Sequence, residues 1–136
     1  MTSSDDQDQK AAPRGPHFVI LALAGLAGAA GVALAAVAAH KVESPALATA
    51  ATMLMIHATA VVALSAVAMQ VVRSRFWIYA AAVMLSAVTL FSGDIALHTL
   101  GGSHIFPRAA PLGGSLLIAS WVAVALLAAL DYRRAS

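Results

Sequence analysis

The amino-acid sequence predicts an all-α protein, a bundle of four transmembrane helices. Of its 136 residues, 61% are hydrophobic and only 10% are charged, whereas an average soluble domain has about 25% charged residues. The apolar residues gather in four long runs, at about residues 18–39, 46–72, 76–100 and 110–130. Each run reaches the roughly 20 residues that a helix needs to cross about 30 Å of hydrocarbon. We therefore expect one membrane domain over residues 17–134, preceded by a disordered polar tail over residues 1–16.

The composition also narrows the possible partners and chemistry. The formal net charge is +2, and the few cationic residues are too scattered to form the basic face that nucleic-acid binding requires. The chain has no cysteine, so it forms neither a disulfide nor a thiolate metal site. No G-x-S-x-G, P-loop or dinucleotide motif is present, and no cofactor is predicted. The expected partners are the lipid bilayer and other membrane proteins or a second copy of the chain.

The first apolar run, residues 18–39, contains Gly25, Gly28 and Gly31 with alanines between them. Small residues let helices approach closely in lipid, where packing rather than the hydrophobic effect drives association. We expect these glycines to pack against a neighbouring helix. A signal peptide is the competing interpretation, with Arg14 as its charged residue. The run exceeds the roughly 7–15 apolar residues usual in such peptides.

The second run, residues 46–72, follows Pro45, which suits the first turn of a helix. The short segment 73–75 leaves room only for a tight turn, so the second and third helices should be antiparallel neighbours. Trp77 and Tyr79 follow this turn and are expected at the membrane interface.

A glycine-containing loop separates the third run from the last, and four helices place both termini on one side of the membrane. That side carries six cations and the other side two, namely Lys10, Arg14, Arg73, Arg75, Arg133 and Arg134 against Lys41 and Arg108. Cations are enriched on the cytoplasmic side of membranes, so we expect both termini in the cytoplasm. Close helix packing is expected in the second half of the chain at Gly93, Gly113 and Gly114.

A carboxylate interrupts the third run at Asp94, and His98 follows one helical turn later. A charged side chain at the bilayer centre costs roughly 2.5–3.5 kcal/mol on insertion scales. We therefore expect Asp94 to have a hydrogen-bond partner, contact with water or a functional role. Counting from Ser74 at about 1.5 Å per residue places His57 opposite Phe91, about 4.5 Å from the level of Asp94. We therefore expect a polar layer in the outer half of the membrane, formed by His57, Asp94, Ser92, His98 and His40. His104 is a further candidate.

Each polar residue has a structural and a functional interpretation. Asp94 is either hydrogen-bonded to its neighbours or it serves proton or solute handling. His57 is either a hydrogen-bonded link between helices or part of a proton or ligand path. His40 and His104 are expected at the membrane interface.

A metal site is an alternative with different chemistry. Asp94, His98 and His104 could hold a divalent ion near the outer surface, since imidazole and carboxylate suit zinc. No H-E-x-x-H or other defined spacing supports this site, so no metal is predicted. A bis-histidine haem site between His40 and His57 fails, because their depths differ by roughly 16 Å.

Four short segments resemble those of a membrane family. Residues 34–40, L-A-A-V-A-A-H, are similar to a G-A-F-G-A-H stretch, and His57 with residues 58–64 is similar to H-A-L-A-L-L. Residues 90–94, L-F-S-G-D, are similar to L-F-S-G-S or L-F-S-G-D, and residues 111–121 are similar to P-x-G-G-x-x-x-x-x-G-W. The chain thereby resembles the bacterial inner-membrane family known as domain of unknown function 423, whose eukaryotic relatives are called transmembrane protein 256.

The order and spacing of these segments agree over residues 18–130, with three departures. Alanines replace the glycines of the first motif, and Ser120 replaces a glycine before Trp121. Met53 and Met55 stand where an aromatic residue usually precedes the histidine of the second helix. The resemblance implies four spans in the inner (plasma) membrane and no established activity.

We therefore expect a non-enzymatic multi-pass membrane protein, either an assembly or interaction partner or a handler of a small solute or protons. A proton handler would exchange protons between His57 and Asp94, with Ser92 and His98 as relays, and would need an oligomer. The alternative is a membrane enzyme or metal-binding protein with an Asp/His site on the outer face. A third possibility is that every polar group is satisfied by its neighbours and serves structure alone.

Overall fold

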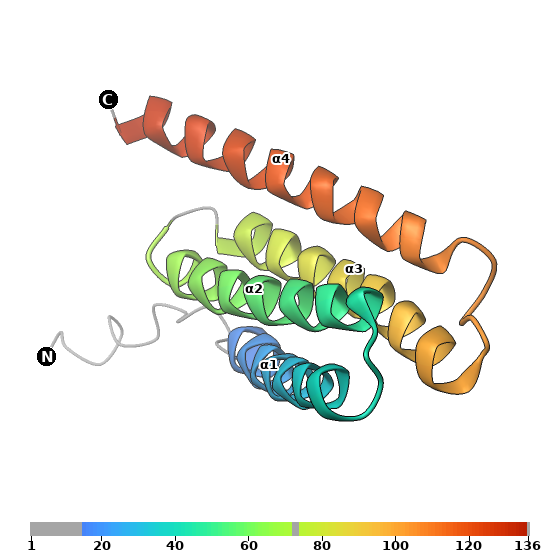
Figure 1. Ribbon diagram of the computed structural model, residues 1–136. Coiled ribbons are helices and arrows are strands. Elements are labelled where there is room, and N and C mark those ends of the chain that lie inside the picture. Colours follow the sequence, from blue (N-terminus) through green and yellow to red (C-terminus); the bar gives the residue numbers. More distant parts are fainter. Residues whose placement is uncertain (1–14, 72–73, 136) are drawn as a thin grey trace, which may run out of the picture.

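The structure is a computed structural model that describes residues 15–71 and 74–135 (Figure 1). That part of the chain forms four helices: α1 (Gly15–His40), α2 (Pro45–Ala68), α3 (Ser74–Gly101) and α4 (Ala109–Ala135). All four are long and apolar enough to cross a membrane, which confirms the predicted fold class. The predicted disordered tail lies outside the described residues, except for Gly15 and Pro16, which belong to α1.

α2 begins with a cap that the sequence supplies. Ser44 precedes the helix in an extended conformation, and its Oγ accepts a hydrogen bond of 3.2 Å from the backbone N–H of Leu47. Pro45 occupies the first turn, where a missing N–H removes no helical hydrogen bond. The helix ends at Ala68, whereas the apolar run continues to residue 72. Hydropathy alone therefore overestimates its length.

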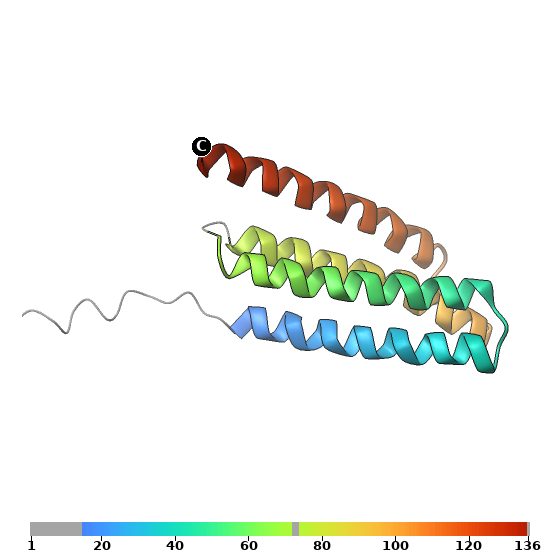
Figure 2. The same ribbon diagram turned by 60° about the vertical axis from the view of Figure 1, so that its left-hand side comes forward.

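The helices α2 and α3 lie between α1 and α4 (Figures 1 and 2). α1 packs mainly on α2, and α4 packs along α3. The start of α1, the end of α2, the start of α3 and the end of α4 lie at one end of the molecule, which we call the terminal end. The α1–α2 and α3–α4 connections lie at the opposite end, the loop end. The largest fully buried apolar side chains of the described residues belong to the two central helices: Leu47, Val61, Met84 and Val88.

The register of α2 against α3 differs from the expected one. Ser92 Oγ on α3 donates a hydrogen bond of 2.8 Å to the carbonyl oxygen of Ala50 on α2. This contact centres the antiparallel pair near residue 71 instead of residue 74, so His57 lies at the level of about residue 85. Asp94 then lies roughly 13 Å further toward the loop end. The predicted match in depth between His57 and Asp94 is wrong, because α2 ends before the segment that was expected to form the turn.

Glycines mark places where neighbouring helices come close. A Cβ atom on Gly31 of α1 would lie 2.6 Å from Met55 Cγ on α2. One on Gly113 of α4 would lie 2.7 Å from the backbone nitrogen of Phe91 on α3. An ordinary contact distance of 3.7 or 3.8 Å would separate a Cβ atom from the neighbouring helix at Gly28 and Gly114. Gly93 was expected to pack against a helix, but a Cβ atom there would meet Ile105 of the α3–α4 loop, at 3.8 Å.

Gly25 does not pack inside the chain, contrary to the expectation from the sequence. A Cβ atom placed on it would have no other atom within 4 Å, whereas Gly28 and Gly31 face α2. Successive residues of a helix are about 100° apart, so a spacing of three residues turns each glycine by about 60° relative to the last. Gly25 is therefore turned by about 120° from Gly31 and faces away from the molecule.

We expect Gly113→Ala to destabilise the protein more than Gly25→Ala. The new methyl group at position 113 would meet backbone atoms of Phe91 and Ala87, which move aside only if α3 and α4 separate. Overpacking of this kind typically costs about 1–3 kcal/mol. Gly25 has free space around it, so the same change there should be neutral or slightly stabilising. Thermal unfolding in detergent measures both, and equal midpoints would contradict the close contact.

Candidate functional site

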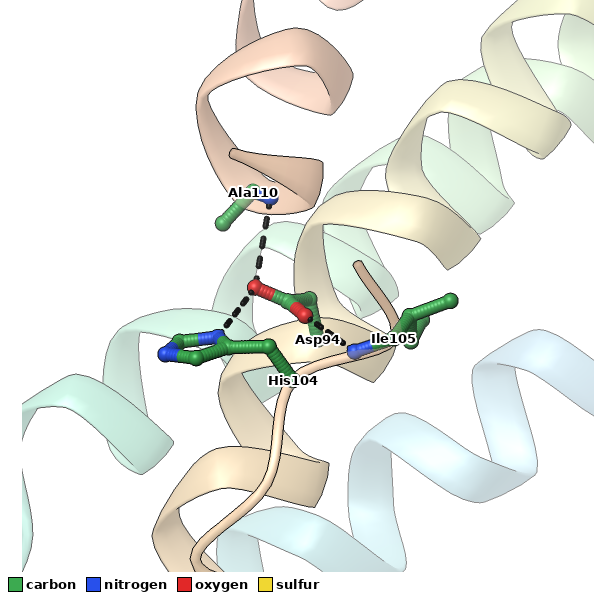
Figure 3. Close-up of polar contacts among 4 residues, drawn as sticks. All are labelled: Asp94, His104, Ile105 and Ala110. Carbon is green, nitrogen blue, oxygen red and sulfur yellow. Dashed lines mark hydrogen bonds and ion pairs between the residues drawn. The ribbon is translucent and has the colours of Figure 1, made fainter. Parts of the chain in front are cut away.

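Asp94 lies at the loop end of α3, and its carboxylate points toward the α3–α4 loop (Figure 3). The side chain is only 2% exposed. Oδ1 accepts a hydrogen bond of 2.8 Å from the backbone N–H of Ile105, and Oδ2 accepts one of 3.0 Å from His104 Nδ1. Oδ2 also accepts a bond of 3.3 Å from the backbone N–H of Ala110, in the first turn of α4. We call these four residues the Asp94 clamp.

The clamp places negative charge where a helix favours it. The unpaired N–H groups and the macrodipole make the first turn of α4 electropositive, and a nearby carboxylate gains about 0.3–1 kcal/mol from this. Burying a charge without partners would cost several times more. His104, which is 50% exposed, completes an ion pair with Asp94 when its imidazole is protonated. The carboxylate therefore fastens the loop and the start of α4 to α3.

The clamped loop holds a residue in an unfavourable backbone conformation. Arg108 has a φ of 70°, in the left-handed region. For a residue other than glycine this conformation costs roughly 1–2 kcal/mol. Arg108 lies between Ile105 and Ala110, the two residues whose backbone N–H groups bond to Asp94. The clamp therefore stabilises a loop conformation in which Arg108 is strained.

His98 and His104 stack beside the clamp, with ring centroids 4.0 Å apart and planes that differ by 11°. The lone pairs of an imidazole lie in the plane of its ring, so two parallel stacked rings do not direct them at one point. Asp94 already occupies His104 Nδ1. In residues 15–71 and 74–135, no group of three or more His, Asp or Glu side chains is arranged to hold a metal ion. The three residues of the alternative metal site, Asp94, His98 and His104, therefore lie close together but are not oriented to coordinate one ion.

His57 lies on the buried face of α2 and uses both of its ring nitrogens. Nδ1 lies 2.7 Å from the carbonyl oxygen of Met53, which can only accept, so Nδ1 carries the proton. Nε2 accepts a hydrogen bond of 3.2 Å from the indole N–H of Trp121 on α4. A neutral imidazole satisfies both contacts. His57 thus links α2 to α4, two helices that make no close backbone contact in the described part of the chain.

The candidate residues fall into separate groups instead of one polar layer. His57 belongs to the link between α2 and α4, and Ser92 is bonded to the backbone of α2. Asp94 and His98 belong to the loop end, and His40 is exposed at the end of α1. No direct hydrogen bond connects these groups within the described residues.

The two tryptophans donate hydrogen bonds that the sequence pattern does not predict. Trp77 Nε1 donates to Asp131 Oδ2 at 2.8 Å, so Trp77 faces α4 and is buried between the helices at the terminal end. Tyr79, two residues later, is exposed as expected of an interfacial residue. A buried indole N–H needs an acceptor. Apolar helices contain few side-chain acceptors, and this scarcity is the signal that could have paired Trp121 with His57.

His17 is a further buried polar residue that the sequence pattern does not single out. It lies near the start of α1, and its Nε2 shares a hydrogen bond of 3.3 Å with Ser74 Oγ at the start of α3. Within the described residues, its Nδ1 has no hydrogen-bond partner. The contact ties α1 to α3 at the terminal end.

Four apolar helices, held together by close packing at glycines and by a few polar contacts, define a small multi-pass membrane protein. Residues 34–114, more than half of the chain, match the family described as protein of unknown function (DUF423), and the chain belongs to this family. The match confirms the resemblance to this family. It runs from the second half of α1 to the start of α4, so it includes His57 and the Asp94 clamp but not Trp121. No solved structure matches the chain.

We expect Asp94→Asn to loosen the α3–α4 loop. The amide keeps the size of the side chain but turns one acceptor into a donor, which then faces the N–H group of Ile105 or Ala110. Hydrogen bonds to charged groups are worth about 1.5–3 kcal/mol, so local opening should rise about tenfold or more. Trypsin cleavage at Arg108, inside the loop, measures this opening in detergent. The control is Glu43→Gln in the exposed α1–α2 link, and equal cleavage of both variants would contradict the clamp.

We expect the changes Trp121→Phe and His57→Phe to be energetically coupled. Each single change leaves one polar partner unsatisfied, whereas the double variant removes both. A double-mutant cycle of unfolding in detergent should give a coupling free energy of about 0.5–1.5 kcal/mol. Ser115→Ala is the control, because Ser115 is bonded only within α4 and its effect should add to that of His57→Phe. A coupling near zero for the tryptophan would mean that the link contributes nothing to stability.

Proposed function

We propose that this protein is a non-enzymatic component of the cell inner (plasma) membrane that acts through lateral association of transmembrane helices, with α1 as the contact helix. The outward face of α1 carries this proposal. Its exposed small residues, spaced three or four positions apart, form one line along the helix: Ala22, Gly25, Ala29, Ala33 and Ala36. We call this line the α1 seam.

The α1 seam has the composition of a helix–helix contact in lipid. Small residues allow two backbones to approach closely, and Gly25, Ala29 and Ala33 repeat the four-residue spacing of known contacts. No described residue covers the seam at Gly25, where an added Cβ atom would meet nothing within 4 Å. A face that touches only lipid tails has no need of such closeness, so the seam favours a helix from outside the chain.

The polar residues favour association over the handling of protons or a solute. Both nitrogens of His57 are bonded, and the carboxylate of Asp94 has three donors. Passing a proton through either residue would break the contacts that attach α4 to the other helices. The structure of these groups therefore fits a rigid scaffold better than a path.

The first partner we propose is a second copy of the chain. A two-fold axis along the α1 seam would bring the same residues of two copies together, as isologous contacts do. In this proposal both termini face the cytoplasm. Among the described residues, the terminal end carries three arginines and the loop end two cations, namely Arg75, Arg133 and Arg134 against Lys41 and Arg108.

A membrane enzyme or metal-binding protein is the alternative from a different class. Its candidate residues, Asp94, His98 and His104, do gather at the loop end. The stacked rings and the fully bonded carboxylate leave no common position for a ligand, so lateral association has the better support.

We expect Ala29→Cys to form a disulfide-linked dimer when the protein is oxidised in its membrane. The chain has no cysteine, so a cross-link reports only the new residue. Position 29 lies in the middle of the α1 seam, where two copies would bring their Cα atoms within the roughly 7 Å that a disulfide spans. The matched control is Ala128→Cys on the exposed face of α4, which should stay monomeric. Gel electrophoresis without reductant shows the result.

Two outcomes decide this experiment. Adding Gly25→Leu to the Ala29→Cys variant should abolish the dimer, because the larger side chain separates the two backbones. If Ala29→Cys gives no more dimer than Ala128→Cys, self-association through α1 is wrong.

A further inference from the structure

A groove between α3 and α4 lies toward the terminal end and is not part of the Asp94 clamp or of the His57 link. Its volume is about 490 Å³, within the roughly 300–1,000 Å³ of typical ligand sites. Three residues of each helix form most of its apolar walls: Phe76, Tyr79 and Val83 from α3, and Ala123, Leu126 and Leu127 from α4.

The groove exists because α3 and α4 diverge from one close contact. At Gly113 the two backbones leave no space for a Cβ atom. Toward the terminal end α4 separates from α3 (Figure 2), and there the long side chain of Trp77 reaches Asp131. Small residues face the space between these two contacts and leave it open: Ala80, Ala119 and Ala123.

The groove has nearly the length of one half of a bilayer. Its walls run over residues 76–83 of α3 and residues 119–127 of α4. At about 1.5 Å per residue these stretches are roughly 10–12 Å long, against about 15 Å for the hydrocarbon of one leaflet. Since α3 begins at Ser74, the groove starts near the membrane surface of the terminal end and runs toward the bilayer centre. An acyl chain of that leaflet has the same position and direction.

Three arginines continue the walls of the groove toward the water. Arg75 lies one helical turn before the lining residue Tyr79, and Arg133 and Arg134 lie two turns beyond the last lining residues of α4. All three arginines are exposed. The carboxylate of Asp131, at the same end, already accepts the indole hydrogen bond described above. The mouth of the groove is therefore positively charged while its walls are apolar.

We propose that this groove binds one acyl chain of an anionic phospholipid, with its phosphate held by Arg75, Arg133 and Arg134. Guanidinium groups bind phosphate oxygens through pairs of N–H donors, and basic pockets between transmembrane helices suit anionic head groups. The apolar walls cover the acyl chain. A zwitterionic lipid fits the same walls, but it brings its own positive charge close to the arginines.

Charge distinguishes this groove from a second one between α1 and α3. The second groove is larger, about 620 Å³, and Leu23 and Leu26 of α1 face Leu85 of α3 across it. α1 contains no lysine or arginine over Gly15–His40. Nothing on that helix selects an anionic head group, so the proposal concerns the groove between α3 and α4 alone.

Native mass spectrometry of the full chain tests the proposal. The protein in detergent is mixed with equal amounts of phosphatidylglycerol and phosphatidylcholine that carry the same acyl chains. We expect at least about fivefold more bound phosphatidylglycerol, since one arginine near an anionic membrane surface contributes about this factor. Replacing the three arginines together, as Arg75→Gln, Arg133→Gln and Arg134→Gln, should remove the preference and leave the binding of phosphatidylcholine unchanged.

A second variant tests the walls of the groove. Ala123→Phe places a ring inside it and should lower the binding of both lipids severalfold. Ala128→Phe adds the same ring to the exposed face of α4, and Arg108→Gln removes a cation at the loop end, so both should bind lipid like the wild type. Circular dichroism shows whether each variant keeps its helices, and Ala119→Leu fills the same wall if Ala123→Phe does not fold.

The possible results separate clearly. Equal binding of the two lipids by the wild type, or an unchanged preference in the triple arginine variant, would overturn the head-group contact. Unchanged lipid binding by the groove-filled variant would overturn the groove as the site. Neither result depends on whether α1 self-associates.

Discussion

The buried carboxylate of Asp94 is the constraint on which the rest of the arrangement depends. A charge inside an apolar segment must find donors, and Asp94 finds them in the loop and in the first turn of α4. Because Ala110 is fixed in this way, Gly113 one turn later meets α3 where a side chain would not fit. The close contact between α3 and α4 at Gly113 thus follows from one acidic residue, and the groove at the terminal end follows from the divergence beyond it.

The remaining polar residues form single hydrogen bonds between pairs of helices. Lipid tails are as apolar as the helices themselves, so apolar surface alone does not fix how helices slide past one another. A hydrogen bond between two helices fixes this register, because its donor and acceptor must lie at matching levels. Three such bonds set the order of the central and last helices: Ser92 to Ala50, Trp121 to His57 and Trp77 to Asp131.

The number of helices could be predicted from the sequence because length and hydropathy determine it, whereas the register could not. The second apolar run continues past the end of α2 at Ala68, and an error of a few residues there moves His57 by several ångströms in depth. Asp94 could be identified from the sequence because a carboxylate is energetically costly inside an apolar segment. Two of its partners are backbone N–H groups, which every residue type except proline offers, so the sequence does not name them. Gly25 shares the spacing of Gly28 and Gly31 but faces another way, and spacing alone does not say which face of the helix is covered.

The order of residues in the Asp94 clamp has a consequence for biosynthesis. Asp94 leaves the ribosome before Ile105 and Ala110, the residues whose N–H groups it needs. Until they arrive, a nascent α3 in the bilayer has an acidic group without donors, so it must keep that group among the lipid head groups or carry it uncharged. Insertion of α3 to its final depth is therefore completed only once translation has passed into α4.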